Sequence, residues 1–525
     1  MRALLGFRPL LRLRQRRGSS LCNWRLLGAA CLASLCSVGC AFGDSGLAPM
    51  ICPGPRQMKM NDLSYVALDG SVPISVECGD ASAADWAKRH FSRWFGTDAG
   101  VTHTQYEGSD AGGEAYRLSV GKAGVVLSAR TLAGIRHAAH SLRQIAIPAR
   151  GTLKVSHYIA PEVDISDAPA LAFRGLHFCW FPETKPEEVE RFVRLAGYLK
   201  FNHVVLESWG TYRSERFPWL GWPDAPMTKA AIARLRGIAE DVGVTLVPSV
   251  NVFGHASHSQ GSTGKHATLD FAPEYQPLFE PVMGWTWCLA NPEARRVLSE
   301  YVAEMHEAFG APRYFHLGCD EATPPSCPDC RRAVYADLVV GHIKALAEML
   351  ERRGARAMIW HDMFLERGDP RWKAEYANGS REMAVRVAEL PRSVVICDWN
   401  YKPPRKDGDY PSFRHFKNLG FDVVTCPYDA TETIDAQGRA ARAAGIMGFL
   451  GTTWNYPEGV TFSKLMIHGA CAAWGGDAAV YANPWSARFL TLLRHVCWDM
   501  GVKDRTLTGV YRYQFHPYGG TKDSK

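Results

Sequence analysis

Residues 172–208 read AFRGLHFCWFPETKPEEVERFVRLAGYLKFNHVVLES, and the pattern of this stretch decides the fold class. An apolar run at 172–178 predicts a buried strand, and an amphipathic pattern at 186–200 predicts a helix. A second apolar run follows at 203–208. Strands that alternate with helices in this way are typical of parallel α/β sheets. The stretch therefore predicts one strand–helix–strand unit of such a sheet.

The same rhythm continues along the chain. The expected strands are residues 172–178, 203–208, 245–251, 313–318, 356–362, 393–399, 422–428 and 448–454. Helical patterns fill the intervals, for example at 186–200, 228–242, 292–309 and 331–353. Eight such units over about 300 residues are typical of a (β/α)₈ TIM barrel. An open doubly wound sheet is the alternative, but no Gly-rich phosphate loop follows the first strand. We therefore expect a barrel over residues 170–500.

A mixed pattern precedes the barrel, over residues 60–160. The elements expected there are a strand at 71–78, a helix at 82–96, strands at 115–120 and 124–130, and a helix at 132–145. This order predicts a small two-layer α+β domain. Pro161 and Pro169 are expected to lie in the linker to the barrel, and residues 501–525 are expected to form a C-terminal tail.

The net charge of +7 is located in the first part of the chain. Residues 1–39 hold seven arginines and no Lys, Asp or Glu, so the remainder carries no net charge. A neutral body gives no reason to expect a nucleic acid as a partner.

The same leader is typical of an export signal over residues 1–40. Its arginines are followed by the apolar stretch LLGAACLASLCSVG at 26–39, which is shorter than the roughly 20 residues of a transmembrane helix. The ending SVGC resembles a bacterial lipoprotein signal, in which Cys40 would carry the lipid anchor. Cleavage of an ordinary signal peptide near residues 41–43 and a retained membrane anchor are the alternatives. We expect an exported protein that is periplasmic, secreted or anchored as a lipoprotein.

Of the 15 cysteines, eleven follow Cys40, and an odd number cannot pair completely within one chain. Cys327 and Cys330, in CPDC, are the one closely spaced pair among them. Half of a zinc site, a tight disulfide and a plain loop all remain open. A metal is the least favoured of the three, because no second pair matches.

Catalytic groups in a TIM barrel sit where the strands end. The predicted strand ends carry carboxylates, aromatic residues and an arginine, which together are typical of a sugar-binding site. In chain order they are Arg174, His177, Glu207, Asn251, His255, Asp320, Glu321, Trp360, His361, Asp362, Asp398, Trp399, Tyr428, Asp429, Trp454 and Asn455. A single Trp in such a position is more often a core residue, but four aromatic strand ends favour a sugar site.

The segment HLGCDE at 316–321 resembles the H-x-G-x-D-E signature of glycoside hydrolase family 20, the β-N-acetylhexosaminidases. It falls at the end of the fourth expected strand, where that family has it. Further likenesses are DAPALAFRGLHF at 167–178, PSVNVFGH at 248–255, MIWHDM at 358–363, VVTCPYD at 423–429 and GTTWNY at 451–456. The second strand and the GCDE ending are closer to the divergent hexosaminidase D-like branch.

This resemblance implies a catalytic pair, Asp320 and Glu321. Family 20 uses the 2-acetamido group of the sugar as the nucleophile, in place of a second carboxylate. By the resemblance, Glu321 is the general acid and later the base, and Asp320 orients the acetamide. The implied substrate-binding residues are Arg174, His255, Trp360, Trp399, Tyr428 and Trp454. No metal and no cofactor are implied.

The resemblance thus predicts a retaining exo-β-N-acetylhexosaminidase that removes terminal β-linked GlcNAc or GalNAc from glycans by substrate assistance. Two alternatives remain open. One is a glycan-binding barrel without catalysis. The other is a barrel glycosidase for 2-hydroxy sugars, such as a β-galactosidase, for which Glu207 or Asp362 would supply the second acid.

Overall fold

The structure, a computed structural model, describes residues 51–476 except for 98–99, 109–111, 151–154, 258–263, 282, 404–407 and 455–458. The expected export signal at 1–40 with Cys40, the expected tail at 501–525 and the last part of the expected barrel lie outside these residues. None of the helices within the described ranges has both the length and the apolar character needed to cross a bilayer.

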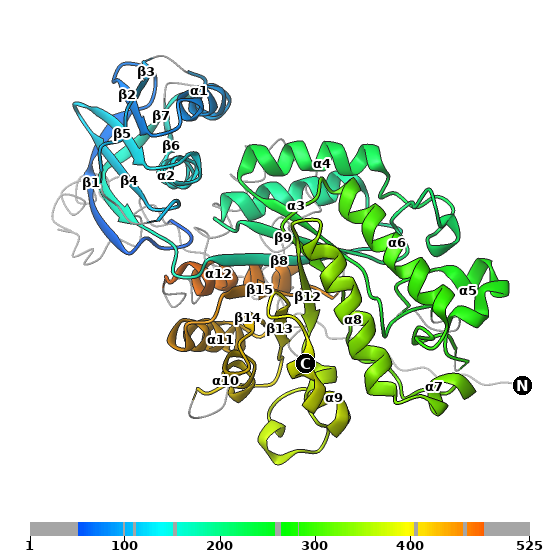
Figure 1. Cartoon of the computed structure of the whole chain (residues 1–525). Helices are drawn as coiled ribbons and strands as arrows, with labels where there is room; N and C mark the ends of the chain where they lie inside the picture. Colours follow the sequence, from blue (N-terminus) through cyan, green and yellow to red (C-terminus); the bar gives the residue numbers. More distant parts are fainter. Residues whose placement is uncertain are drawn as a thin grey trace, which may run out of the picture. The chain divides into compact units, whose positions relative to one another are not determined.

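The first part of the described chain is a seven-stranded sheet with two helices (Figure 1). Its strands are β1 (Gln57–Ala67), β2 (Ile74–Cys78), β3 (Val101–Thr104), β4 (Tyr116–Gly121), β5 (Gly124–Ala129), β6 (Ile147–Arg150) and β7 (Val155–Asp167). The helices are α1 (Ser82–Phe95) and α2 (Leu132–Ile145). The strand order is β1-β7-β4-β5-β2-β3, and β6 also pairs with β7. Both helices bury an apolar face in one core with the sheet, which confirms the expected α+β domain.

One boundary of this domain differs from the prediction. Pro161 lies inside β7 and not in a linker, because β7 continues to Asp167. A proline cannot donate to a strand ladder, so it is tolerated where the pairing is irregular. Pro161 faces Tyr65 at the position where the register between β1 and β7 shifts, and the pairing of β7 with β4 begins only at Val163.

The second part is a closed barrel of eight parallel strands, as the sequence predicts. The strands are β8 (Phe173–Trp180), β9 (His203–Ser208), β10 (Thr245–Ser249), β11 (Tyr314–His316), β12 (Arg356–Trp360), β13 (Val395–Trp399), β14 (Asp422–Cys426) and β15 (Gly448–Gly451). Pairing of β15 with β8 closes the barrel. All eight strands overlap the predicted ones, because strands buried on both faces read as nearly continuous apolar runs.

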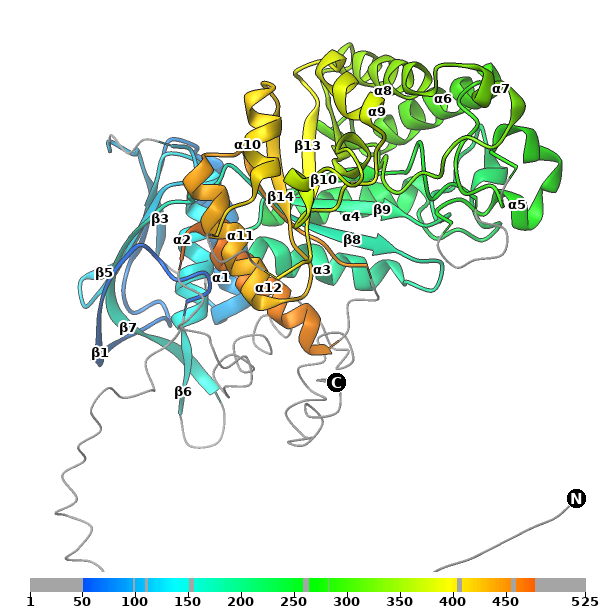
Figure 2. The same cartoon turned by 90° about the horizontal axis from the view of Figure 1, so that it is seen from below.

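Helices cover the outside of the barrel. They are α3 (Pro186–Tyr198), α4 (Lys229–Val242), α6 (Pro292–Ala308), α8 (Tyr335–Glu351), α9 (Arg381–Arg386), α10 (Pro411–Asn418), α11 (Thr431–Ala444) and α12 (Gly459–Trp474). Figures 1 and 2 show α10, α11 and α12 together on one side. The single helix predicted at 331–353 is wrong in its first turn, since a short helix ends at Arg332 and α8 begins at Tyr335.

Short elements lie in the connections that follow the strands. They are η1 (Pro218–Leu220), α5 (Thr268–Phe271), η2 (Pro273–Leu278), α7 (Pro328–Arg332), η3 (Asp362–Phe364), η4 (Pro370–Trp372) and η5 (Val387–Glu389). The helices after them begin at local sequence signals. The Asn291 side chain accepts a hydrogen bond from Glu293 N–H, and Pro292 opens α6. Gly243, in the left-handed region at φ 75°, ends α4.

The α+β domain contacts the barrel through buried charges. Arg174 pairs with Glu114, and the fully buried Lys200 lies 3.4 Å from Asp167. The same Asp167 carboxylate accepts hydrogen bonds from Tyr116 in β4 and from the indole of Trp474 in α12. Because a buried charge is costly without its partner, these groups hold the two parts together.

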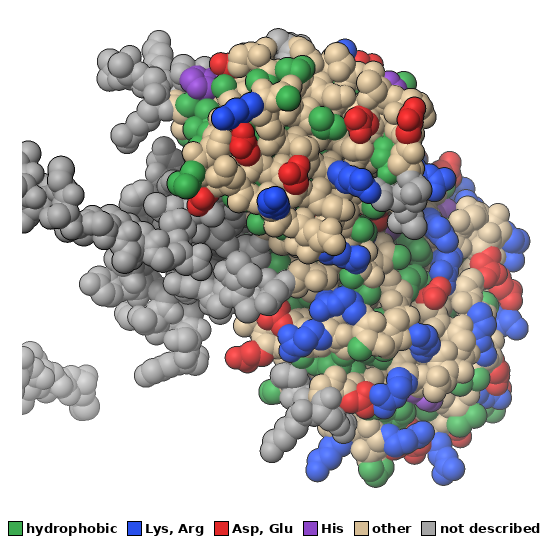
Figure 3. Space-filling model, turned by 90° about the vertical axis from the view of Figure 1, so that its left-hand side faces the viewer, with side chains coloured by type: hydrophobic (Ala, Val, Ile, Leu, Met, Phe, Trp, Pro, Cys, Tyr) green, Lys and Arg blue, Asp and Glu red, His purple; other side chains and the backbone are tan. Residues whose placement is uncertain are grey.

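On the face shown in Figure 3, basic and acidic side chains are interspersed.

Candidate active site

A strained turn carries the two acids. After β11 the chain passes through Gly318 at φ 67°, Cys319 at φ 78° and Glu321 at φ 46°. Left-handed backbone at a residue other than glycine costs on the order of 1–3 kcal/mol and collects at functional sites. The turn gives the adjacent acids different surroundings, since the side chain of Asp320 is 7% exposed and that of Glu321 is 46% exposed.

Polar groups from the third barrel strand and its loop surround Asp320. Asn251 Nδ2 donates to Asp320 Oδ1 at 2.5 Å, and the other end of the same amide accepts from Cys319 N–H at 2.9 Å. The Lys265 ammonium lies 3.9 Å from Asp320 Oδ2 and donates to Glu207 at 2.9 Å. Burial lowers the pKa of Lys265, but Asp320 and Glu207 outweigh it and hold the pKa above its ordinary value. The Lys265 ammonium therefore lies between two buried carboxylates.

Glu321 is held through its backbone and contacted through its carboxylate. Its N–H donates to Asp362 Oδ2 at 3.1 Å, and its C=O accepts from the Trp285 indole at 2.7 Å. Nε2 of His255 lies 3.2 Å from the Glu321 carboxylate and 3.4 Å from that of Asp320. The backbone is therefore fixed by two hydrogen bonds, while the carboxylate is open to solvent on one side.

The loop after β10 packs directly on the turn, and it can do so only at a glycine. A Cβ built on Gly254 would lie 2.1 Å from the carbonyl oxygen of Asp320 and 2.8 Å from the N–H of Ala322. Real Cβ atoms do not approach backbone so closely. Gly254 thus lets the VFGH segment bring His255 onto the acid pair.

Asp362 supports the turn from the fifth barrel strand. It is fully buried and accepts hydrogen bonds from Glu321 N–H, Asn378 Nδ2 and Trp399 Nε1. Burial, together with the charge of nearby Asp320, raises the pKa of Asp362 to about 6. Both acids therefore belong to one electrostatic system.

Aromatic side chains from the later strands lie together, as expected for a sugar site. Trp454 Nε1 donates to the Tyr401 hydroxyl at 2.5 Å, and the Trp454 ring lies 5.7 Å from Trp360. Tyr401 links this group to Tyr428 at 5.5 Å and to Trp399 at 5.3 Å between ring centres. The predicted residues Trp360, Trp399, Tyr428 and Trp454 thus form one connected set. Lys265 joins this set to Asp320, since its ammonium lies 5.3 Å from the Trp454 ring.

Arg174 is not brought to this group, which corrects its assignment as a substrate-binding residue. It is the second residue of β8, beside Phe449 of β15, and so lies at the amino end of the barrel. Its guanidinium contacts Glu114, the carbonyl of Lys200 and the Trp474 ring. We assign it to the contact with the α+β domain. Catalytic groups gather at the opposite, carboxyl ends of the strands.

Sequence reasoning missed several residues of the site. Lys265 follows a loop without a recognisable pattern, and Trp285 lies 30 residues beyond His255 in another part of the same loop. Tyr401 comes two residues after the end of β13, where a strand-end search stops. A search for aromatic residues just beyond each strand end could have found Tyr401. Nothing in the local sequence marks Lys265.

Both parts of the chain match family models. The model described as glycosyl hydrolase family 20, domain 2, matches residues 48–168. The model described as glycosyl hydrolase family 20, catalytic domain, matches residues 206–455. A β-N-acetylhexosaminidase from Cellulomonas fimi is 29% identical over 189 residues, covering 32% of this chain and 35% of that protein. The match thus spans about a third of that relative's length.

Solved structures share the fold at low identity. The β-N-acetylhexosaminidase from Bacteroides fragilis has a TM-score of 0.61 at 19% identity, covering 85% of this chain and 96% of that one. An N-acetyl-β-hexosaminidase from Streptomyces plicatus gives 0.64 at 17%, covering 88% and 97%. A family 20 exo-β-N-acetylglucosaminidase from Vibrio harveyi gives 0.63 at 17%, covering 88% and 79%.

The chain is thus an α+β domain followed by a parallel β/α barrel, with a pair of carboxylates at the carboxyl ends of the barrel strands. With both of its parts matched, the chain belongs to glycosyl hydrolase family 20.

Proposed function

We propose that this chain is a retaining exo-β-N-acetylhexosaminidase, which hydrolyses terminal β-linked GlcNAc or GalNAc from glycans. The observation that carries the proposal is the unequal pair of acids at the strained turn. Asp320 is enclosed by Asn251, His255 and the Lys265 ammonium, whereas Glu321 faces solvent. One acid is thus enclosed by polar groups and a cation, and the carboxylate of the other is accessible to a leaving group or water.

In the proposed reaction, the carbonyl oxygen of the sugar's 2-acetamido group attacks the anomeric carbon while the glycosidic C–O bond breaks. Glu321 gives its proton to the leaving oxygen. Asp320 accepts a hydrogen bond from the acetamide N–H and balances the positive charge of the oxazolinium ion that forms. Glu321 then takes a proton from water, whose oxygen attacks the anomeric carbon and opens the oxazolinium ring. Two displacements on opposite faces retain the β configuration.

Other residues would place the sugar. Tyr428 would donate to the acetamide oxygen, and Trp360, Trp399 and Trp454 would wall the pocket. Holding the internal nucleophile close to the anomeric carbon supplies much of the rate in an intramolecular step. The Vibrio harveyi structure was solved in complex with N-acetylglucosamine, which supports a 2-acetamido sugar as substrate.

The surroundings of the other acids speak against a second carboxylate as nucleophile. Glu207 is fully buried and is engaged by Lys265 and the Trp209 indole. Asp362 is fully buried and accepts three hydrogen bonds. Neither has the open face that attack on a sugar carbon requires.

Aryl β-glycosides that differ only at C2 test the proposal. We expect hydrolysis of the 2-acetamido glycoside and no measurable hydrolysis of the 2-hydroxy glycoside. Activity on the 2-hydroxy substrate alone would favour a carboxylate nucleophile. A chain that binds the 2-acetamido sugar but hydrolyses neither substrate would be a glycan-binding protein.

We also propose that the protein is exported by its leader, with Cys40 as the point of lipid attachment. The Arg-rich and apolar halves of residues 1–39 and the ending SVGC support this. The mass of the mature N-terminus tests it, since a lipidated chain begins at a modified Cys40.

A further inference from the structure

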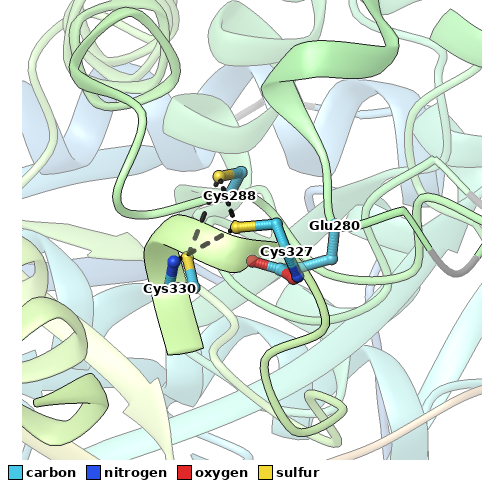
Figure 4. Close-up of side chains that lie close together, drawn as sticks. All are labelled: Glu280, Cys288, Cys327 and Cys330. Atoms are coloured by element: carbon cyan, nitrogen blue, oxygen red, sulfur yellow. Dashed lines mark hydrogen bonds between the residues drawn. The ribbon is translucent and has the colours of Figure 1, made fainter. Parts of the chain in front are cut away.

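Three sulfur atoms and a carboxylate lie close together in the loops that follow β10 and β11 (Figure 4). Glu280 and Cys288 come from the connection between β10 and α6, and Cys327 and Cys330 come from the connection between β11 and α8. We call these four residues the cysteine cluster. One ligand atom from each lies within 4.8 Å of the others, and all four residues are buried.

The spacing of the sulfur atoms fits a tetrahedral metal ion. Sγ of Cys288 lies 3.6 Å from that of Cys327 and 3.8 Å from that of Cys330. Zinc bonds thiolate at about 2.3 Å, so two sulfurs at a tetrahedral angle lie about 3.8 Å apart. A disulfide would bring two sulfurs to about 2 Å and would leave the third cysteine without a covalent partner. A metal uses all three.

Glu280 gives an independent indication of a cation. Its side chain is fully buried, and within the described residues no Lys, Arg or His forms an ion pair with it. Oε2 accepts from Ser326 N–H, the Ser326 hydroxyl and Cys327 N–H. Oε1 is also buried, and no N–H or O–H group of the described chain donates to it. A buried carboxylate is stable when it is paired with a charge or coordinates a metal.

Backbone groups already support two of the sulfurs. Cys330 N–H donates to Cys327 Sγ at 3.2 Å, and Ala290 N–H donates to Cys330 Sγ at 3.4 Å. Such N–H···S bonds spread the negative charge of metal-bound thiolates and orient them. A second group of candidate ligands consists of His177, Cys179 and Glu207. Its carboxylate already has a counter-charge, because the Lys265 ammonium pairs with Glu207.

We propose that the cysteine cluster binds one structural zinc ion through Cys288, Cys327, Cys330 and Glu280. On binding, the three thiols release their protons to solvent, and the ion joins three thiolates and one carboxylate. Four protein ligands leave no open position, which is the pattern of a structural and not a catalytic zinc site.

The zinc would fix the two loops that flank the acid pair. Between Glu280 and Cys288 the loop supplies Trp285, whose indole donates to the Glu321 carbonyl. The same loop supplies Thr286, whose hydroxyl lies 2.9 Å from that of Thr323, two residues beyond Glu321. The ion would thereby fix the loop whose Trp285 and Thr286 contact the acid-bearing turn. This inference stands on the cluster alone and does not depend on the proposed reaction.

Metal analysis of the full-length protein, purified without a metal-affinity tag, tests the proposal. We expect about one zinc per chain in the wild type. Cys288→Ser and Cys330→Ser should lose most of it, while Cys78→Ser, at a buried thiol in β2, should keep it. Less than a tenth of an equivalent in the wild type, or full zinc in both cluster variants, overturns the proposal.

Two measurements on the wild type guard against variants that fail to fold. Replacement of the bound ion by Co²⁺ should give the intense visible bands of tetrahedral cobalt and a thiolate charge-transfer band in the near ultraviolet. Peptide mapping without reduction should find the three cysteines unlinked. A disulfide between any two of them, or an octahedral cobalt spectrum without thiolate bands, contradicts a zinc site.

Discussion

At the scale of the residue, Asp320 and Glu321 show how two chain neighbours receive different surroundings. The left-handed turn separates their carboxylates, Asn251 and Lys265 enclose the first, and His255 touches both. The repulsion between two adjacent charges is thus offset by a buried ammonium and an amide. These three residues all lie in the connection between β10 and α6, more than 50 residues before the acids in sequence.

The two acids should respond differently to the leaving group. With a poor, alkyl-type leaving group, Glu321→Gln should lower kcat/KM, which reports the step that breaks the glycosidic bond, by about 10²–10⁴, because proton donation is lost. With a good leaving group such as a dinitrophenolate, the loss should be much smaller. Asp320→Asn should lose activity with both substrates, because the acetamide is no longer oriented. Steady-state kinetics on both aryl and alkyl 2-acetamido glycosides give the comparison.

The exposed Glu389, which pairs with Arg386 on the barrel surface, provides the matched control. Glu389→Gln should leave both substrates unaffected. Equal losses for Glu321→Gln with good and poor leaving groups would rule out its role as the proton donor.

Asp362 predicts a pH dependence of stability. Its pKa is raised to about 6 in the folded state, chiefly by burial and by Asp320, against about 3.9 for an unfolded aspartate. The contribution to stability is therefore full below about pH 4 and is lost as the pH rises through 6. Asp362→Asn removes this loss. Between pH 4 and pH 7, we expect the free energy of unfolding of the variant to rise relative to that of the wild type by up to about 3 kcal/mol.

Urea denaturation of both proteins at several pH values measures this gain. His361 lies beside Asp362, and its pKa is lowered to about 4 by burial although the Asp362 charge raises it, so the two proteins are compared with His361→Asn in both. A difference in unfolding free energy that stays constant with pH would show that Asp362 keeps an ordinary pKa.

The single residues also show where sequence reasoning ends. Asp320, Glu321 and His255 could be found because a strand end followed by polar residues is a local pattern. Arg174 was misplaced because it was counted with the strand ends, although it stands near the start of the expected strand 172–178 and so at its amino end. Glu280 and Cys288 lie about 40 residues before the CPDC pair, so only the folded loops bring them to it.

At the scale of the element, the eight strands were predictable and the irregular connections were not. The strands are short, apolar and separated by helical periods, and each of these signals is local. The first turn of the helix expected at 331–353 was wrong, because α7 and α8 continue the same polar and apolar pattern across the break at Ala333. The break places Cys330 in the cysteine cluster, which is a tertiary effect.

The packing of the VFGH segment on the acid-bearing turn predicts a sharp effect of one methyl group. Gly254→Ala would force the turn away from its position, since the new Cβ overlaps the Asp320 carbonyl. We expect kcat to fall about 10²-fold or more, because a shift of about 1 Å in a catalytic group has that effect. Kinetics and thermal melting of the variant provide the measurement.

Gly237→Ala is the control, because a Cβ at that helical position of α4 meets nothing within 4 Å. It should leave activity unchanged and raise the free energy of unfolding by about 0.5–1 kcal/mol. Normal activity of Gly254→Ala would mean that the turn is not held by this contact.

At the scale of the whole molecule, one buried carboxylate contacts both the α+β domain and the barrel. Asp167 contacts Tyr116 in β4, Trp474 in α12, and Lys200 in the connection between α3 and β9. Asp167→Ala should lower the free energy of unfolding by about 3–5 kcal/mol, because it leaves the buried Lys200 ammonium without a counter-charge. Calorimetry should show the wild type unfolding in one transition.

An exposed ion pair supplies the comparison for this change. Arg296 and Glu293 pair on the surface of α6, so Glu293→Gln should leave the melting temperature unchanged within error. Two separate transitions in the wild type, with Asp167→Ala affecting only one, would show that the two parts fold independently.

The α+β domain grips the barrel at the strand ends that Arg174 marks, and the acids occupy the other ends. If the protein is attached to a solid support through the α+β domain, the acids therefore lie at the strand ends away from the support. A chemical handle at Lys59, an exposed residue of the outer strand β1, would leave the reactive opening turned toward bulk liquid. Beads prepared in this way should therefore process bulky, polymeric sugars about as fast as the free protein does.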